Sequence, residues 1–289
     1  MRGRGVLLML AASIGFSLMS VLLKALAPRI PTAELVLFRC ALPLPFLVWW
    51  LRRRGIPLVA RNRPLMLGRA VAGTIAMSLS FYAIARLPLA DVTLIGKVEP
   101  VLIALLAPAL LGERPAGRTI GCLMASIAGA ALVLQPSLRI GNLAGLAALV
   151  ASLAGALAHL SVRRMSADDD PAVIVLGFTV FTAVFAAIAA APTAVLPTPG
   201  EALGLVAMAA LATVAQLLMT HAYVIEEASV VSGVSYVTVP LAVLWGWMLW
   251  NERPGPLAAV GGVLVVGAGI ALLRSRRFTG QRRYAPRVA

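Results

Sequence analysis

Long apolar segments, separated by short polar breaks, occupy nearly the whole chain. Each segment is long enough to cross a bilayer as a helix, which takes about 20 apolar residues. The apolar residues are continuous rather than alternating at every second position, and this favours helices over the strands of a membrane barrel. The pattern predicts an all-α polytopic membrane protein with ten transmembrane helices at residues 5–26, 33–51, 66–86, 90–111, 117–135, 143–162, 171–191, 202–223, 229–249 and 256–273.

The composition supports a chain that is surrounded by lipid. Hydrophobic residues make up 61% of it and charged residues only 12%, whereas a water-soluble domain carries about 25% charged residues. The first apolar segment resembles a signal peptide with Arg2 and Arg4 before it. Its apolar run is longer than the usual signal region, so we expect it to be retained as a helix.

The arginines predict the orientation in the membrane. With both termini in the cytoplasm, most loop arginines lie on the cytoplasmic side, and the other side holds only Arg29, Arg86, Arg139 and Arg253. This bias predicts a multi-pass inner-membrane protein with a basic cytoplasmic tail at 274–289. The net charge of +14 is then explained by anionic lipid headgroups, and we expect no nucleic-acid partner.

The chain aligns with itself at an offset of about 140 residues. The aligned positions are Ser13 with Ser152, Lys24 with Arg163, Pro31 with Pro171, Tyr82 with Tyr223, Pro100 with Pro240 and Glu113 with Glu252. These matches predict a first five-helix repeat at 1–140 and a second at 141–273. Because five is odd, the second copy enters the membrane from the opposite side. Inverted repeats of this kind are typical of secondary transporters.

Several motifs of the first repeat resemble a known family. They are the segment 87–93, Glu99-Pro100, Gly112-Glu113-Arg114 and, in the second span, Phe38-Arg39. Together with the doubled five-helix pattern, they resemble the EamA-type transporters of the drug/metabolite transporter superfamily. The resemblance implies an inner-membrane carrier that moves small organic metabolites, often outward. It does not select among amino acids, nucleotide sugars, vitamins and toxic cations.

Polar residues recur at helical spacing inside four of the spans, in matching helices of both repeats. These stripes are Ser13, Ser17, Ser20 and Lys24; Ser152, Gly155, His159 and Arg163; Thr213, Gln216, Thr220 and Tyr223; and Ser232, Ser235 and Tyr236. They predict a shared polar cavity. The alternative for the serines is hydrogen bonding between packed helices. The glycines of the fifth and tenth spans predict packing helices or a homodimer face.

Three charged residues lie inside spans and break the symmetry of the repeat: Arg39, Lys97 and Glu99. On a continuous helix Lys97 and Glu99 point to nearly opposite sides, so they should not pair with each other. A charge inside a bilayer normally faces a cavity or a partner. The alternative is a buried ion pair between Arg39 and Glu99. The symmetric Glu113 and Glu252 are expected to stabilise the start of the helix that follows each of them.

These observations predict a secondary transporter that moves a small metabolite, anionic or amino-acid-like, across the inner membrane by alternating access, with export as the expected direction. The predicted substrate-binding residues are Ser17, Ser20, Arg39, Tyr82, Lys97, His159, Gln216, Thr220, Tyr223, Ser232 and Tyr236. The sequence has no nucleotide-binding loop, and we expect no catalytic residue, cofactor or metal. The expected partners are a small-molecule substrate and membrane lipids. The alternatives are a flippase for lipids or lipid-linked headgroups and, further away, an intramembrane enzyme that uses a serine with His159.

Overall fold

The computed structural model of the chain is helical throughout its described part, which comprises residues 4–111, 143–165, 168–226, 234–253 and 255–276 with a few single positions in between. The elements are α1 (Arg4–Leu26), α2 (Thr32–Ala41), α3 (Leu44–Arg53), α4 (Arg63–Ile84), α5 (Leu89–Gly96), α6 (Val98–Leu111), α8 (Leu143–Met165), α9 (Pro171–Ala190), η1 (Ala191–Thr193), α10 (Pro199–Ile225), η2 (Ser235–Val237), α12 (Thr238–Trp250) and α13 (Pro256–Arg276). Most of the predicted fifth span lies outside the described residues.

Three helices begin with the same local device, a polar cap followed by proline. The Asn62 side chain accepts a hydrogen bond from the amide of Leu65 at 3.0 Å, and Asp170 accepts one from Ala172 at 2.8 Å. Thr198 and Glu201 form a reciprocal capping box at the start of α10. Such caps satisfy amides that have no partner within the helix, which is why these helices begin close to the predicted positions.

Among the described residues, six helical segments are long and apolar enough to cross a membrane. They are Arg4–Leu26, Thr32–Arg53, Arg63–Ile84, Leu143–Met165, Pro171–Thr193 and Pro199–Ile225. The second of these was expected as one unbroken helix. It is divided into α2 and α3 at Leu42 and Pro43, because proline lacks the amide that would continue the helical hydrogen bonds. The architecture is that of an all-helical, multi-pass membrane protein.

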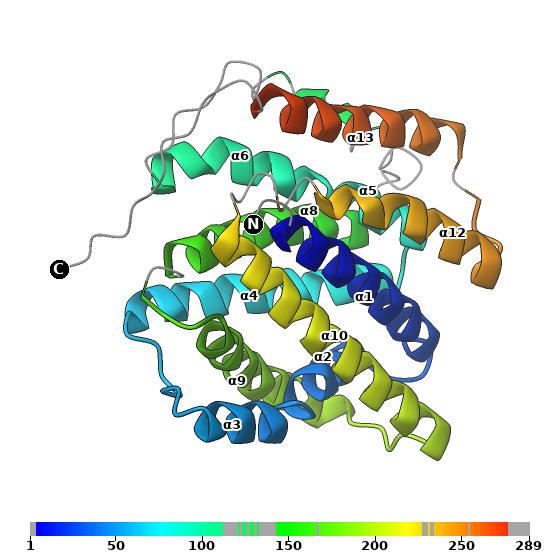
Figure 1. The fold of residues 1–289 in the computed structure, drawn as a ribbon. Helices are drawn as coiled ribbons and strands as arrows, with labels where there is room; N and C mark the ends of the chain where they lie inside the picture. Colours follow the sequence, from blue (N-terminus) through cyan, green and yellow to red (C-terminus); the bar gives the residue numbers. More distant parts are fainter. Residues whose placement is uncertain are drawn as a thin grey trace.

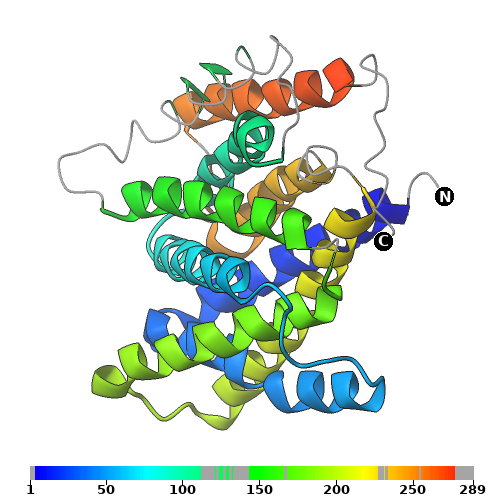
Figure 2. The ribbon, with the colours of Figure 1, turned by 90° about the vertical axis from the view of Figure 1, so that its left-hand side faces the viewer.

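The closest helix packing joins the first part of the chain to the second. α1 lies along α10, α4 lies along α8 and α2 packs on α9. In the numbering of the ten predicted spans, span one contacts span eight, span three contacts span six, and span two contacts span seven. α13 lies along one edge of the molecule beside α5 and α6, and α3 lies at the opposite edge in both views (Figures 1 and 2).

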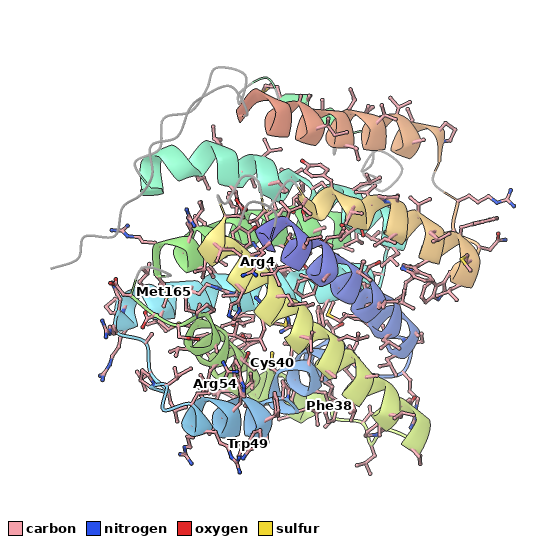
Figure 3. All side chains as sticks on the ribbon, in the orientation of Figure 1. Arg4, Phe38, Cys40, Trp49, Arg54 and Met165 are labelled. Atoms are coloured by element: carbon pink, nitrogen blue, oxygen red, sulfur yellow. The ribbon has the colours of Figure 1, made fainter. Side chains whose placement is uncertain are left out.

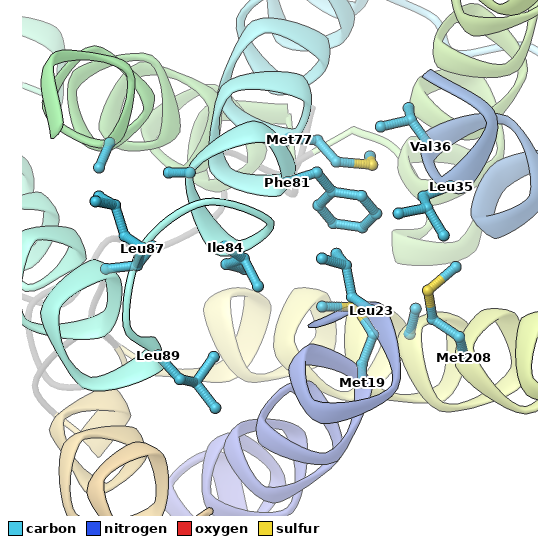
Figure 4. Packing of buried hydrophobic residues seen from close by; sticks show 14 of the residues in the cluster. Met19, Leu23, Leu35, Val36, Met77, Phe81, Ile84, Leu87, Leu89 and Met208 are labelled. Carbon is cyan, nitrogen blue, oxygen red and sulfur yellow. The ribbon is translucent and has the colours of Figure 1, made fainter. Parts of the chain in front are cut away.

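Buried apolar side chains fill the space between these pairs. Leu23 of α1, Leu35 of α2, Phe81 of α4 and Met208 of α10 meet in one cluster (Figure 4). Large apolar side chains also remain exposed on the outer faces, as for Ile188 at 72% exposure. In water such exposure would be costly. In a bilayer these side chains contact lipid.

Candidate functional site

A cavity of about 310 Å³ lies where these helices meet. Its lining comes from α1, α2, α4, α5, α6, α8, α9, α10, η2 and α12, and the described lining includes no residue of α3 or α13. A second hollow, of about 610 Å³, is lined only by residues between Leu44 and Arg53. It includes the half-exposed Trp49 at the edge of the molecule (Figure 3), so it is a surface groove along α3. The cavity among the helices is the better site for a ligand.

The cavity is bordered by a break in the predicted fourth span. α5 ends at Gly96, Lys97 takes φ −76° and ψ 0°, and α6 starts at Val98. Pro100 has no amide, and its ring clashes with the carbonyl of the residue four positions earlier, Gly96. Lys97 and Glu99 therefore both line the cavity. The expectation that they point to opposite sides was wrong, because it assumed a continuous helix.

The equivalent region of the second repeat is also irregular. The short 3-10 helix η2 precedes α12, which carries Pro240 near its start. The Lys97 ammonium donates hydrogen bonds to the Ser235 carbonyl at 2.8 Å and to the Ser235 hydroxyl at 3.1 Å. The Tyr236 hydroxyl donates to the Lys97 carbonyl at 3.1 Å. These contacts connect the irregular segments of the two repeats beside the cavity. Discontinuous helices border the substrate sites of many transporters.

Two buried arginines form a positively charged wall of the cavity. Arg39 is 6% exposed and Arg69 is 2% exposed. Their guanidinium carbons lie 6.0 Å and 4.4 Å from the centre of the same Phe178 ring. Gly73 makes room for Arg69, because a Cβ atom there would lie 2.1 Å from its Nη1. The two like charges share one part of the lining.

Three buried donors on this wall have no partner in the described structure: Nε of Arg39, Nε of Arg69 and Nε2 of Gln216. Arg39 donates to Gln216 Oε1 at 3.3 Å, which leaves the amide nitrogen of Gln216 unused. Buried donors without acceptors are costly, and all three belong to residues that line the cavity. The wall therefore suits a ligand that supplies acceptors and negative charge.

A carboxylate also lines the cavity. Glu99 Oε1 lies 2.6 Å from Nδ1 of His159, and the His159 ring stacks on Tyr223 with 5.1 Å between ring centres. The alternative ion pair between Arg39 and Glu99 is not formed in the described structure. In the same part of the chain no serine is hydrogen-bonded to His159, so the geometry that an intramembrane hydrolase would need is not observed there.

The predicted substrate residues fall into two groups. Those that line the cavity are Ser17, Ser20, Arg39, Lys97, His159, Gln216 and Tyr223. Three others lie outside the lining: Tyr82, whose ring is 3.7 Å from the guanidinium of Arg86; Thr220, which is buried; and Tyr236, which contacts Lys97. Tyr82 differs from its repeat partner Tyr223 because its ring lies beside Arg86 instead of at the cavity. Ser232 lies outside the described residues.

Sequence reasoning missed Arg69 and did not place Glu99 in the cavity. Arg69 lies only a few residues after the predicted start of its span, close to the loop arginines, and so was not considered. Arg69 could have been predicted from its position inside an apolar segment, because a charge inside a bilayer needs a cavity or a partner. For Glu99 an ion pair with Arg39 was only the alternative prediction, and its contact with His159 depends on the break at Lys97.

Two basic residues at aligned sequence positions lie in the last turn of a helix, Lys24 on α1 and Arg163 on α8, outside the described lining of the cavity. Lys24 forms an ion pair with Glu252 and donates to the Leu87 carbonyl at 2.8 Å. The other oxygen of Glu252 accepts from the Leu89 amide at 2.9 Å. Glu252 was expected to stabilise the helix that follows it, α13. It instead caps α5 of the first repeat.

The fold and the charged cavity define a membrane transporter for small molecules. The model of the EamA-like transporter family matches residues 3–135 and again 142–274, so the chain belongs to this family. This match confirms the resemblance drawn from the motifs. The family comprises transporters rather than enzymes.

Named relatives are also transporters. The chain is 31% identical over 275 residues to the pseudopaline exporter CntI of Pseudomonas aeruginosa, covering 94% of this chain and 97% of the relative. It is 29% identical over 277 residues to a riboflavin transporter of Rhizobium johnstonii, covering 94% and 91%. One solved crystal structure shares the fold, with a TM-score of 0.71, 20% identity, and coverage of 97% of this chain and 100% of the other.

Proposed function

We propose that this chain is a secondary transporter that exports a small organic metabolite carrying a carboxylate or phosphate. The observation that carries the proposal is the set of three buried cationic side chains, Arg39, Arg69 and Lys97, that line one cavity. An anionic group accepts hydrogen bonds from such donors and offsets their charge. Export as the direction is supported by the relative named an exporter.

The helix packing supports alternating access between two inverted repeats. If residues 1–140 and 141–273 are related by a two-fold axis in the membrane plane, the contact of α1 with α10 must be equivalent to that of α4 with α8. Both contacts are among the closest in the molecule. The contact of α2 with α9 then lies on the axis. The proposed topology has ten spans and both termini in the cytoplasm, as the arginine distribution predicts.

Metabolite screening followed by flux measurement tests this function. The purified protein is screened by thermal shift against carboxylates, phosphates, neutral sugars and organic cations, and each hit is assayed for flux in proteoliposomes. We expect stabilisation by acidic metabolites only, and flux of at least one of them. Hits confined to cations would contradict the proposal. Movement of a fluorescent phospholipid without any metabolite flux would favour the flippase.

The cationic wall is tested by Arg69→Met and Lys97→Ala. Each variant should lower the affinity for the hit about tenfold or more, because a hydrogen bond to a charged group contributes about 1.5–3 kcal/mol. Arg52→Met is the matched control, since Arg52 is an exposed arginine at the end of α3. Normal transport by both site variants would show that the ligand binds elsewhere.

A further inference from the structure

The cavity carries a negatively charged group that the proposed function does not use. Glu99 lines the same cavity as Arg39, Arg69 and Lys97, and its charge is close enough to act on both Arg69 and Lys97. A ligand with carboxylates as its only charges would be attracted by the three cations and repelled by Glu99. The position of Glu99 therefore limits which anions the cavity accepts.

One oxygen of the Glu99 carboxylate has a hydrogen-bonding partner among the described residues, and the other has none. Oε1 is 2.6 Å from Nδ1 of His159, and the stacking of His159 on Tyr223 fixes the ring. Among the described residues, none is hydrogen-bonded to Oε2. The Glu99 side chain is 25% exposed, far more than Arg39 or Arg69, and because Glu99 lines the cavity this exposed part faces it.

The neighbouring helix leaves space for this arrangement. A Cβ atom at Gly155 of α8 would lie 2.6 Å from Glu99 Oε2 and 3.0 Å from its carboxyl carbon. A side chain at this position would therefore displace the carboxylate. A neutral imidazole that donates through Nδ1 orients Glu99 without neutralising it. In that tautomer Glu99 is a negatively charged acceptor beside the cavity.

We infer that Glu99 forms a second subsite, which binds the ammonium group of an amino-carboxylate while the cationic wall binds its carboxylates. Three cations and one carboxylate favour a ligand with more carboxylates than ammonium groups. This inference rests on the proposed function and narrows it from anions in general to amino acids with an acidic side group or to larger molecules of the same charge pattern.

The test compares two acids that differ only by an ammonium group, aspartate and succinate. Binding of each to the purified full-length protein is measured by thermal shift and calorimetry. The wild-type protein should bind aspartate about tenfold more tightly than succinate, the difference expected for one charge-assisted hydrogen bond. Glu99→Gln, which keeps the size and the acceptor for His159, should bind both within about threefold of each other. Succinate should bind this variant at least as well as it binds the wild type, because the repulsion is removed.

A second pair of variants separates a subsite from a structural role. Gly155→Ala should reduce the preference for aspartate in the same way, because it displaces the carboxylate. Gly68→Ala on α4, where a Cβ atom meets nothing within 4 Å, should keep it. Equal binding of the two acids to the wild type, or a preserved preference in Glu99→Gln, overturns the inference but leaves the proposed function standing if Arg69→Met weakens both acids. If neither acid binds the wild type while other carboxylates stabilise it, the inference is overturned and the proposed function stands. If no acidic metabolite stabilises the wild type, both are overturned.

Discussion

The C-terminal ends of α1 and α8 carry a basic residue at aligned sequence positions, but these two residues have different partners. Lys24, at the end of α1, pairs with the Glu252 carboxylate from the other repeat. Arg163, at the end of α8, donates to the backbone carbonyls of Tyr223, Val224 and Glu226 at 2.9–3.2 Å. The first contact crosses between the repeats, and the second closes the C-terminal end of α10 within one repeat.

This difference in partners predicts that the two aligned helix ends contribute unequally to stability. Lys24 is 13% exposed and Glu252 is 20% exposed, so each depends on the other to offset the loss of water. The carbonyls that Arg163 contacts are uncharged, so the loss of Arg163 leaves no unpaired charge on them. Removing one residue should therefore cost more at the Lys24 end than at the Arg163 end.

The largest effect should come from Glu252→Ala. This change removes the partner of Lys24 and the acceptor for the Leu89 amide at the start of α5. Loss of one member of a buried pair costs about 3–5 kcal/mol, and partial exposure reduces this to roughly 2–3 kcal/mol. Unfolding in mixed detergent micelles measures the change. As a control, Arg29→Ala removes an ion pair with Glu201 in which the arginine is 48% exposed, and should cost much less than Glu252→Ala because solvent screens the pair.

A charge exchange sharpens the same comparison. Lys24→Glu and Glu252→Lys should each be more harmful than the alanine variant, because each places like charges together. Combined, they should recover roughly half of the lost stability, since the attraction returns but a lysine cannot accept from the Leu89 amide. A double-mutant cycle on unfolding free energies gives the coupling. Complete recovery would show that the amide contact of Glu252 contributes nothing.

Most helix positions could be predicted from the sequence because they depend on local properties. The apolar run at 143–162 became α8, Leu143–Met165, and that at 5–26 became α1, Arg4–Leu26. Length, hydrophobicity and nearby caps suffice for such helices. The break at Lys97 was harder to predict from the sequence. Pro100 indicated lost hydrogen bonds, but the residue at which the backbone would bend depends on packing against η2.

The site was predictable where it followed helical spacing and failed where it depended on long-range contacts. Ser17 and Gln216 lie on regular helices, and their spacing placed them on the cavity side. The contact of Glu99 with His159 spans 60 residues, and that of Glu252 with Leu89 spans 163. Such pairs cannot be predicted from the periodicity of a single helix, because their two residues lie on different helices. They follow from how the two repeats pack together.

Arg163→Met tests the weaker end. The variant loses the charged donor to the carbonyls at the end of α10 and should lower the unfolding free energy by about 1.5 kcal/mol, the lower end for a hydrogen bond to a charged group, because the contact is only part-buried. Arg163→Lys retains a positive charge beside those carbonyls and should lose less. A loss equal to that of Glu252→Ala would show that the contact of Arg163 within one repeat contributes as much stability as the contact of Lys24 between the repeats.

The smallest change in unfolding free energy should come from a substitution of Asn251, whose backbone conformation positions Glu252. Asn251 ends α12 with φ +52°, a left-handed conformation that asparagine and glycine adopt readily. The Glu252 amide then bonds to the Gly246 carbonyl at 3.0 Å, and a Cβ atom at Gly246 would lie 3.0 Å from Glu252 Oε2. Asn251→Gly should change the unfolding free energy by less than about 0.5 kcal/mol, whereas Asn251→Ala should lower it by about 1 kcal/mol. The first repeat has Gly112 at the aligned position, which is the replacement that we expect to be tolerated. If alanine proved as stable as glycine, the left-handed turn would not be what positions Glu252, and the strength of the Lys24 end would have to come from the ion pair alone.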